Sequence, residues 1–275
     1  MQIRTHSIIF SLVVIFLCTA CGNQTQDTAK GQLLKPILGA SSTLSDADKL
    51  KSILDAEKLD AYGVYKSLKG QDLDYTVLSR FVRAIYVDVN REYERKHKLE
   101  WYLSRLPLVE FATVLYYLKE NNHKTFMDIG SGNGDKLFMA LLMGFDKVYG
   151  VEYETKLHTS AMQALKSLVD NKVCDLREGD ATKLGDEYYA QADFIYMYCP
   201  LILNKPVQAK LMLRLIKNMR DNTMIYEAGF VYPKELSELI KTKFDDGYRG
   251  FLAVKKENGK YYYRYFISQW EELQL

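Results

Sequence analysis

From residue 124 onward, short apolar runs alternate with longer segments whose apolar residues recur at helical spacing. The strand-like runs cover residues 125–129, 147–152, 172–178, 193–198 and 223–227. The helical segments between them cover residues 136–144, 156–170 and 206–220. This alternation predicts βαβ units, and hence a mostly parallel sheet covered by helices on both faces.

The end of the chain follows a different pattern. After a helix predicted over residues 233–244, the segment "FLAVKKENGKYYYRYFI" contains two strand-like runs joined at Asn258 and Gly259. An Asn-Gly pair between such runs is typical of a two-residue β-hairpin. The sequence therefore predicts an α/β fold whose parallel sheet ends in a C-terminal antiparallel hairpin.

The first part of the chain predicts a different organisation. We expect a signal peptide or membrane anchor over residues 1–21 and a flexible linker, rich in Gly, Ser, Thr and Gln, over residues 22–45. Helical periodicity then marks residues 46–121 as a helical lead-in or cap. The main α/β domain follows over residues 122–275.

The N-terminus carries an apolar run over residues 7–17, followed by Thr19, Ala20 and Cys21. A run of this length is about half of the ~20 residues that span a bilayer, and fits the core of a signal peptide. The segment resembles a bacterial lipoprotein signal, which implies lipidation of Cys21 after cleavage. It departs from that pattern at Cys18, where leucine is usual, so another cleaved signal or an uncleaved anchor stays open.

The composition of the chain argues against some classes of partner and site. The chain has 275 residues, is 48% hydrophobic and carries a net charge of +2, which suits a globular domain. This small surplus gives no support to nucleic acid as the partner. The four cysteines do not form the paired ligand sets of a zinc site. Two of them, Cys174 and Cys199, would form either one disulfide or two buried thiols.

The segment "FMDIGSGNGDKLF", residues 126–138, places a glycine-rich loop between a predicted strand and a predicted helix. A phosphate-binding P-loop requires Gly and Ser or Thr where this chain has Asp135 and Leu137. A dinucleotide fingerprint requires its third glycine at Asp135, whose carboxylate would face the pyrophosphate. Both types of nucleotide loop are therefore disfavoured.

The loop has instead the spacing DxGxGxG, and it resembles that of class I S-adenosylmethionine-dependent methyltransferases. The resemblance covers residues 124–275 and implies a Rossmann-like fold with S-adenosylmethionine as the cofactor. It implies cofactor contacts from five loop residues: Asp128, Gly130, Ser131, Gly132 and Gly134. Glycines leave room for the ligand, and carboxylates suit a cofactor that carries an ammonium and a sulfonium.

Two downstream positions extend the resemblance. Glu152 ends the second predicted strand, where an acidic side chain can bridge the two ribose hydroxyls. Asp180 follows the third strand and resembles the position that contacts the adenine amino group, with Ala181 beside the ring. The alternative for Asp180 is a turn-forming Gly-Asp pair.

The fourth predicted strand ends in Tyr198, Cys199 and Pro200, which the resemblance places on the side of the methyl acceptor. These residues do not match the Asn/Asp-Pro-Pro-Tyr motif of enzymes that methylate exocyclic amines or glutamine amides. If a general base is needed, Tyr198 and Glu227 are the candidates, although packing is the ordinary role of each.

Two functions follow from these patterns. The first is a methyltransferase whose acceptor is a protein side chain or a small molecule. The second is a non-catalytic envelope lipoprotein that retains a Rossmann-like ligand-binding fold. The N-terminus predicts a membrane-associated, lipid-anchored envelope protein. S-adenosylmethionine is made in the cytoplasm, so an anchored domain that faces the cytoplasm is the other topology.

Overall fold

The structure is a computed structural model. It describes residues 59–69, 75, 77–79, 81–83, 108–198, 200–201, 204–228, 252–265 and 269–273. The predicted signal, the linker, the helix over residues 233–244, Cys21 and Cys199 lie outside these residues.

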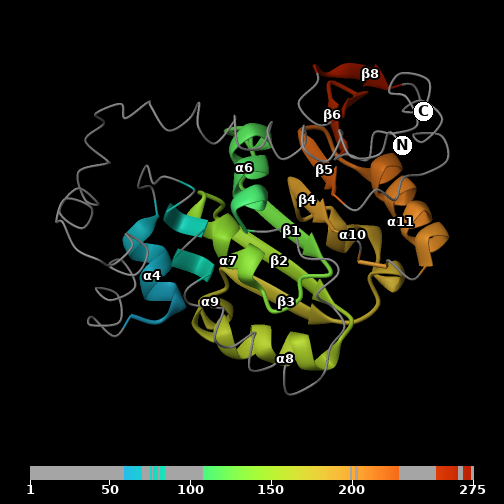
Figure 1. Cartoon of the computed structure of the whole chain (residues 1–275). Coiled ribbons are helices and arrows are strands. Elements are labelled where there is room, and N and C mark those ends of the chain that lie inside the picture. The colour runs from blue at the N-terminus through green and yellow to red at the C-terminus, as the bar shows by residue number, and fades with distance from the viewer. Residues whose placement is uncertain are drawn as a thin grey trace, which may run out of the picture.

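A twisted sheet forms the centre of the described chain (Figure 1). Its strands are β1 (Thr125–Ile129), β2 (Lys147–Glu152), β3 (Cys174–Glu178), β4 (Phe194–Met197), β5 (Thr223–Glu227), β6 (Leu252–Glu257), β7 (Lys260–Tyr265) and β8 (Glu271–Leu273). Their order is β3-β2-β1-β4-β5-β6-β7-β8. Strands β1 to β5 are parallel, and β6, β7 and β8 pair antiparallel.

The predicted parallel strands and the hairpin are confirmed. At the hairpin, Asn258 and Gly259 have φ values of 52° and 75°, which suits a turn with two left-handed residues. Strand β3 begins two residues later than predicted because Lys172 has a φ of 60°, which extended backbone does not permit. The short strand β8 was not predicted, because its sequence Glu-Glu-Leu has no apolar alternation long enough to reveal it.

The helices are α4 (Ala61–Leu68), α6 (Leu108–Leu118), α7 (Asp135–Leu142), α8 (Thr155–Ala164), α9 (Lys166–Asp170), α10 (Asp186–Tyr189) and α11 (Lys205–Asn218), with a 3₁₀ turn η3 (Ala181–Lys183). The helix predicted over residues 156–170 divides into α8 and α9, since Leu165 has a ψ of 12°. Helix α10 was missed because one turn is too short to show periodicity.

Successive side chains of each strand point to opposite faces of the sheet, so each face has its own apolar core. On one face, Phe126, Phe194 and Tyr196 pack beneath α6 and α7. On the other face, Ile195 and Ile225 lie in the core that α10 and α11 cover. The result is the predicted three-layer, doubly wound, Rossmann-like fold, in which the sheet is buried on both sides.

Asp193 joins several elements at the amino ends of the strands. Its Oδ2 accepts hydrogen bonds from the backbone N–H groups of Lys124 and Thr125, at 3.0 and 3.1 Å, and from Thr125 Oγ1 at 2.9 Å. Its Oδ1 lies 3.2 Å from the guanidinium of Arg220, just after α11. This one carboxylate therefore fixes β1 and α11 next to β4.

Three further findings bear on the predictions. Cys174 is a free and buried thiol, as one of the two alternatives for this cysteine predicted, and burial raises its pKa to about 12. No helix of the described ranges is long and apolar enough to cross a membrane. Within those ranges, no three His, Cys, Asp or Glu side chains gather as metal ligands would.

Candidate functional site

The candidate site lies where the order of the strands reverses direction. From β1 the chain adds β2 and β3 on one side, and it then returns to add β4 and β5 on the other. The connections after β1 and β4 therefore lead to helices on opposite faces of the sheet, α7 and α11. Open α/β sheets bind their ligands at such a reversal point. The glycine loop, residues 130–134, is the connection that leaves β1 at this point.

All three glycines of this loop have positive φ values, of 83°, 56° and 83° in chain order. A Cβ atom on Gly130 would lie 3.0 Å from Cβ of Pro200, and one on Gly134 would lie 2.6 Å from Leu165. Among the described residues, no atom lies within 4 Å of the position of a Cβ on Gly132. The outer glycines thus permit close packing on two neighbours, and the middle glycine borders open space.

Asp128 lies two residues before Gly130, the first residue of the loop, and is 2% exposed. Its neighbours in register are Gly150 on β2 and Tyr196 on β4, so Asp128 lies near the carboxyl end of the two central strands. Burial raises the pKa of Asp128 to about 8. This value includes the charge of Lys136, which lowers the pKa of Asp128, and the smaller effects of Asp135 and Glu152, which raise it. A buried acid of this kind favours a cationic group of a ligand.

Helix α7 brings a charged pair next to this acid. Asp135 is the first residue of the helix, and its Oδ1 accepts a hydrogen bond from the backbone N–H of Lys136 at 2.8 Å. The ammonium of Lys136 lies 3.8 Å from the same oxygen, and both side chains are mostly buried, at 13% and 14% exposed. With Asp128 and Glu152, the site holds three acidic groups and one basic group.

Glu152 connects the glycine loop to the end of β2. Its Oε2 accepts a hydrogen bond from the backbone N–H of Gly132 at 2.7 Å, and its Oε1 accepts one from Glu154 at 2.8 Å. Burial raises the pKa of Glu152, and these backbone donors act in the opposite direction. Because each carboxylate oxygen has a second lone pair, both can still accept hydrogen bonds from hydroxyl groups of a ligand.

Asp180 and Ala181 lie at the end of β3, where η3 begins. Asp180 caps this turn, since its Oδ1 accepts hydrogen bonds from both the backbone N–H and the hydroxyl of Thr182, at 2.9 and 2.7 Å. Both bonds lower the pKa of Asp180, and the bond from the Thr182 hydroxyl has the larger effect. Ala181 is buried, and its carbonyl accepts a hydrogen bond from the hydroxyl of Tyr189. The predicted contacts of both residues with adenine stay predictions.

The residues predicted for the acceptor side leave the end of β4. Pro200 lies against Gly130, and Tyr198 packs against the core beneath α6. Glu227 ends the neighbouring strand β5 in register with Met197, and it is completely buried. The structure thus brings the loop after β4 into contact with the glycine loop.

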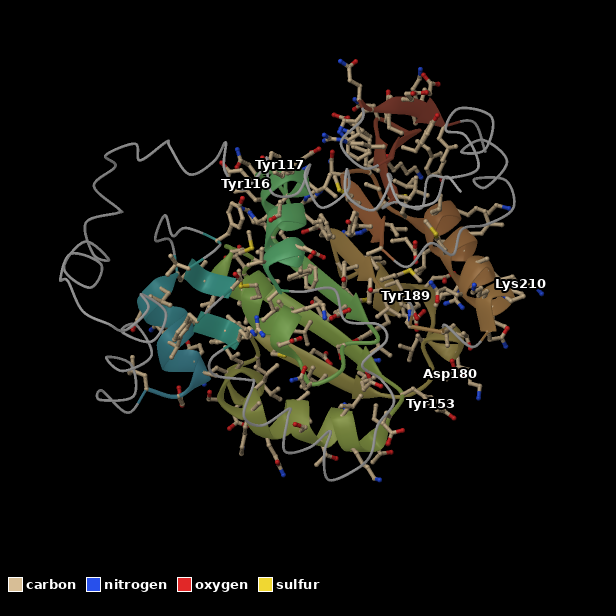
Figure 2. The ribbon with its side chains drawn as sticks, in the orientation of Figure 1. Tyr116, Tyr117, Tyr153, Asp180, Tyr189 and Lys210 are labelled. Carbon is tan, nitrogen blue, oxygen red and sulfur yellow. The ribbon has the colours of Figure 1, made fainter. Side chains whose placement is uncertain are left out.

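Two residues of the site were missed by the sequence predictions. Tyr153 directly follows Glu152 and is 76% exposed, although it is a large aromatic residue (Figure 2). Lys136 was assigned only to a helix, and its ammonium is close enough to affect the pKa of Asp128. Tyr153 could have been identified from the sequence, because it is an aromatic residue directly after the predicted site residue Glu152. The position of Lys136 depends on the direction in which α7 leaves the loop.

Comparison with known proteins gives matches to structures only. No protein-family profile and no curated protein matches the chain. An RNA methyltransferase from Salinibacter ruber, in complex with S-adenosyl-L-homocysteine, aligns with a TM-score of 0.38 at 20% identity, over 45% of this chain and 76% of its own. A precorrin-6y C5,15-methyltransferase from Geobacter metallireducens aligns with a TM-score of 0.39 at 15% identity, over 55% and 76%. At these values the likeness concerns the fold, and the ligand must be inferred from the residues of the site.

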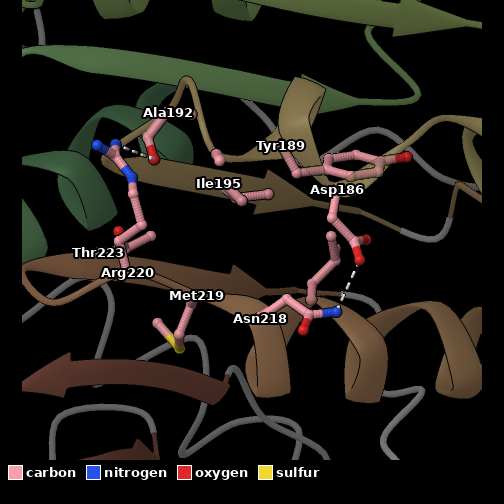
Figure 3. A pocket seen from close by; sticks show the side chains of 10 residues that line it. Asp186, Tyr189, Ala192, Ile195, Asn218, Met219, Arg220 and Thr223 are labelled. Carbon is pink, nitrogen blue, oxygen red and sulfur yellow. Dashed lines mark hydrogen bonds between the residues drawn. The ribbon is translucent and has the colours of Figure 1, made fainter. Parts of the chain in front are cut away.

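A small pocket lies elsewhere, between α10, α11 and the amino ends of β4 and β5 (Figure 3). It encloses an empty volume of about 280 Å³, which includes some open solvent. Two hydrogen bonds join residues of its lining, since Asn218 donates to Asp186 at 2.9 Å and Arg220 donates to the carbonyl of Ala192 at 3.5 Å. The pocket is at the edge opposite the glycine loop, where parallel sheets do not place ligand sites.

Proposed function

We propose that this protein binds S-adenosylmethionine at the glycine loop and transfers its methyl group to a protein side chain or a small molecule. The observation that carries the proposal is a pair of buried carboxyl groups at the glycine loop: Asp128, at the end of β1 before the loop, and Glu152, which accepts a hydrogen bond from the N–H of Gly132. They occupy the reversal point of a doubly wound sheet, where ligands of such sheets bind.

The charges of the site fit this cofactor. S-adenosylmethionine carries an ammonium, a sulfonium and a carboxylate, so its net charge is positive. Asp128 would hold the ammonium, which would favour the ionised form of this acid. Lys136, whose ammonium lies 3.8 Å from Asp135, supplies a positive charge that would stabilise the carboxylate of the cofactor. A phosphate ligand would instead face Asp128, Asp135 and Glu152 together.

Glu152 is suited to the ribose of the cofactor. The backbone bonds from Gly132 and Glu154 fix both carboxylate oxygens before a ligand arrives. Two adjacent hydroxyl groups would then find two oxygens that are already oriented, so little side-chain entropy would be lost on binding. Tyr153, exposed beside it, presents a ring on which a purine can stack.

When bound, the cofactor would supply an electrophilic methyl group on a cationic sulfur, and the neutral thioether would be the leaving group. The protein's contribution to such a transfer is to hold the acceptor in line. Positioning of this kind supplies on the order of 7–11 kcal/mol of barrier reduction. The contact of Pro200 with Gly130 sets the loop after β4 against the cofactor loop, which supports the assignment of residues 198–200 to the acceptor side.

The transfer is tested with methyl-labelled S-adenosylmethionine and the full-length chain in detergent. We expect label to enter a protein or small-molecule fraction of a cell extract, and Asp128→Ala to reduce the rate at least tenfold, which corresponds to about 1.4 kcal/mol. Equal labelling by the folded wild type and the folded variant would overturn the proposal.

We further propose that the chain is attached to a membrane through a lipid on Cys21. The support comes from the apolar N-terminal run and the small residues before this cysteine. Metabolic labelling with a fatty acid should be lost in Cys21→Ser and kept in Cys18→Ser. Labelling that persists in Cys21→Ser would exclude lipidation at this site. A phosphatase fused to the C-terminus would report which side of the membrane the domain faces.

A further inference from the structure

A buried polar pair, Gln208 and Glu227, lies between α11 and the end of β5. Both residues are 0% exposed. The side-chain amide of Gln208 donates from Nε2 to Glu227 Oε1 at 3.0 Å. The residues of α11 next along the helix, Leu211 and Met212, belong to the apolar core on this face of the sheet. The pair is therefore a polar contact inside an otherwise apolar layer.

Gln208 also holds the loop that leaves β4. Its Oε1 accepts a hydrogen bond from the backbone N–H of Leu201 at 3.1 Å. The carbonyl of Leu201 in turn accepts from the backbone N–H of Asn204 at 2.7 Å, at the start of α11. The amide group of Gln208 thus uses its oxygen for the loop and its nitrogen for Glu227, which fixes its orientation.

The other side of the same loop rests on the cofactor loop. Pro200 lies so close to Gly130 that a Cβ on this glycine would approach within 3.0 Å of the proline ring. Leu201, the next residue, is the one that Gln208 holds. The connection after β4 is therefore fixed on one side by Gln208 and on the other by the glycine loop.

Apolar packing alone does not explain this pair. Burial of a carboxylate and an amide is costly unless each is hydrogen-bonded, and apolar residues of similar size are often at least as stabilising. Hydrogen bonds are directional, so a buried polar pair can fix the position of a third group that is bonded to it. Here that group is the backbone of the loop assigned to the acceptor side.

We propose that Gln208 and Glu227 are positioning residues, which fix the loop after β4 against the glycine loop and thereby set the acceptor side relative to the cofactor. Glu227 acts through Gln208, and Gln208 acts through the N–H of Leu201. The role in methyl transfer rests on the proposed function, whereas the effect on the loop does not.

The test exchanges the two side chains. Gln208→Glu places a second carboxylate opposite Glu227 and removes the amide donor. The double variant Gln208→Glu/Glu227→Gln reverses the pair: the amide now on β5 would donate to the carboxylate now on α11, which would still accept from Leu201. Gln208→Leu, which suits the apolar surroundings, removes both hydrogen bonds and serves if Gln208→Glu does not fold. Asn218→Ala, which removes a hydrogen bond to Asp186 at the other end of α11, is the control.

The first measurement is amide hydrogen exchange at Leu201 and Asn204 in the full-length chain in detergent, without ligand. We expect Gln208→Glu and Gln208→Leu to speed this exchange at least tenfold, and the double variant to restore it to within about twofold of wild type. Asn218→Ala should leave it unchanged. Unchanged exchange in a folded Gln208→Leu, or no restoration in a folded double variant, would overturn the proposal.

The second measurement is the affinity for S-adenosyl-L-homocysteine. We expect Gln208→Glu to weaken it about threefold or more through the contact of Pro200 with Gly130, and the double variant to recover it. If the loop responds as predicted but the affinity of Gln208→Glu equals that of wild type, the coupling to the cofactor loop is wrong. If the wild type itself does not bind this ligand, the proposed function fails, and the exchange data still decide the role of the pair.

Discussion

Asp128 and Glu152 are both buried at the carboxyl edge of the sheet, but the two sites differ in how well they stabilise an ionised carboxylate. Glu152 receives hydrogen bonds from the backbone of Gly132 and Glu154, which stabilise a carboxylate. Around Asp128, burial dominates and raises its pKa to about 8. In the absence of a ligand, Asp128 is therefore a costly residue, and a cation is the group that would compensate for it.

This cost predicts how stability depends on pH. The pKa of Asp128 is about 8 in the folded chain and near 3.8 when exposed, so the folded state holds more protons between these values. The contribution of Asp128 to stability is therefore complete below pH ~4 and is lost as pH rises through ~8. Asp128→Asn should raise the free energy of unfolding by about 1 kcal/mol or more at pH 8, and by less at pH 5.

Thermal unfolding at pH 5 and pH 8 measures this effect. Asp180→Asn is the matched control, because hydrogen bonds lower the pKa of Asp180 and its substitution should not stabilise the protein at pH 8. If Asp128→Asn melts below the wild type at pH 8, the assignment of a raised pKa to Asp128 is wrong.

The same pKa predicts a proton released on ligand binding. If Asp128 pairs with an ammonium, it must ionise, so binding at pH 7 should release up to about 0.9 proton from this group. Affinity should therefore rise with pH between ~6 and ~8. Calorimetry in two buffers with different ionisation enthalpies measures the released protons. Equal heats in both buffers would show that Asp128 does not ionise on binding.

At the scale of elements, the site depends on how closely the loops after β1 and β4 approach. Gly130 is the point of contact, since its φ of 83° and the nearby ring of Pro200 leave no room for a side chain. Gly259 in the hairpin has a similar φ of 75°, but among the described residues no atom lies within 4 Å of a Cβ placed there. The two glycines therefore differ in contacts and not in backbone conformation.

Gly130→Ala and Gly259→Ala form a matched pair. Each should lose on the order of 1–2 kcal/mol of stability because of the positive φ. Only Gly130→Ala should also weaken the binding of S-adenosyl-L-homocysteine, by about tenfold or more, because the loop must move away from Pro200. Titration of both variants measures this difference. An equal affinity in the two would contradict the role given to the contact.

The amino ends of the strands depend on Asp193. Removal of its carboxylate leaves the backbone N–H groups of Lys124 and Thr125 without their acceptor and Arg220 without its ion pair. Asp193→Ala should therefore lower the free energy of unfolding by about 2–4 kcal/mol. Denaturant unfolding of the wild type and of Asp193→Ala measures this loss of stability. The affinity for S-adenosyl-L-homocysteine should stay within about twofold of wild type, and a larger loss would mean that the two edges are coupled.

At the scale of the whole molecule, the two edges of the sheet have different roles. The amino edge holds the hydrogen bonds of Asp193 and the hydrogen bond between Asn218 and Asp186 in the small pocket. The carboxyl edge holds Asp128, Glu152 and an open position at Gly132. The hydrogen bonds that join β1, β4 and the end of α11 are at one edge, and the groups that favour a ligand are at the other.

The sequence predicted most of this arrangement because its signals are local. Apolar alternation located β1 to β5, and the glycine spacing after Asp128 located the site. The contacts that join distant segments could not be predicted, because nothing near Gly130 points to Pro200 and nothing near Gln208 points to Glu227. The raised pKa of Asp128 likewise depends on layers contributed by several elements.

The binding of S-adenosyl-L-homocysteine to the full-length chain in detergent, measured by titration calorimetry at pH 8, tests the central claim most directly. We predict saturable binding at one site, with a dissociation constant on the order of 1–100 μM. Glu152→Ala should weaken it about tenfold or more, because the ribose would lose its acceptor. A folded wild-type chain that gives no heat at millimolar ligand would contradict the account.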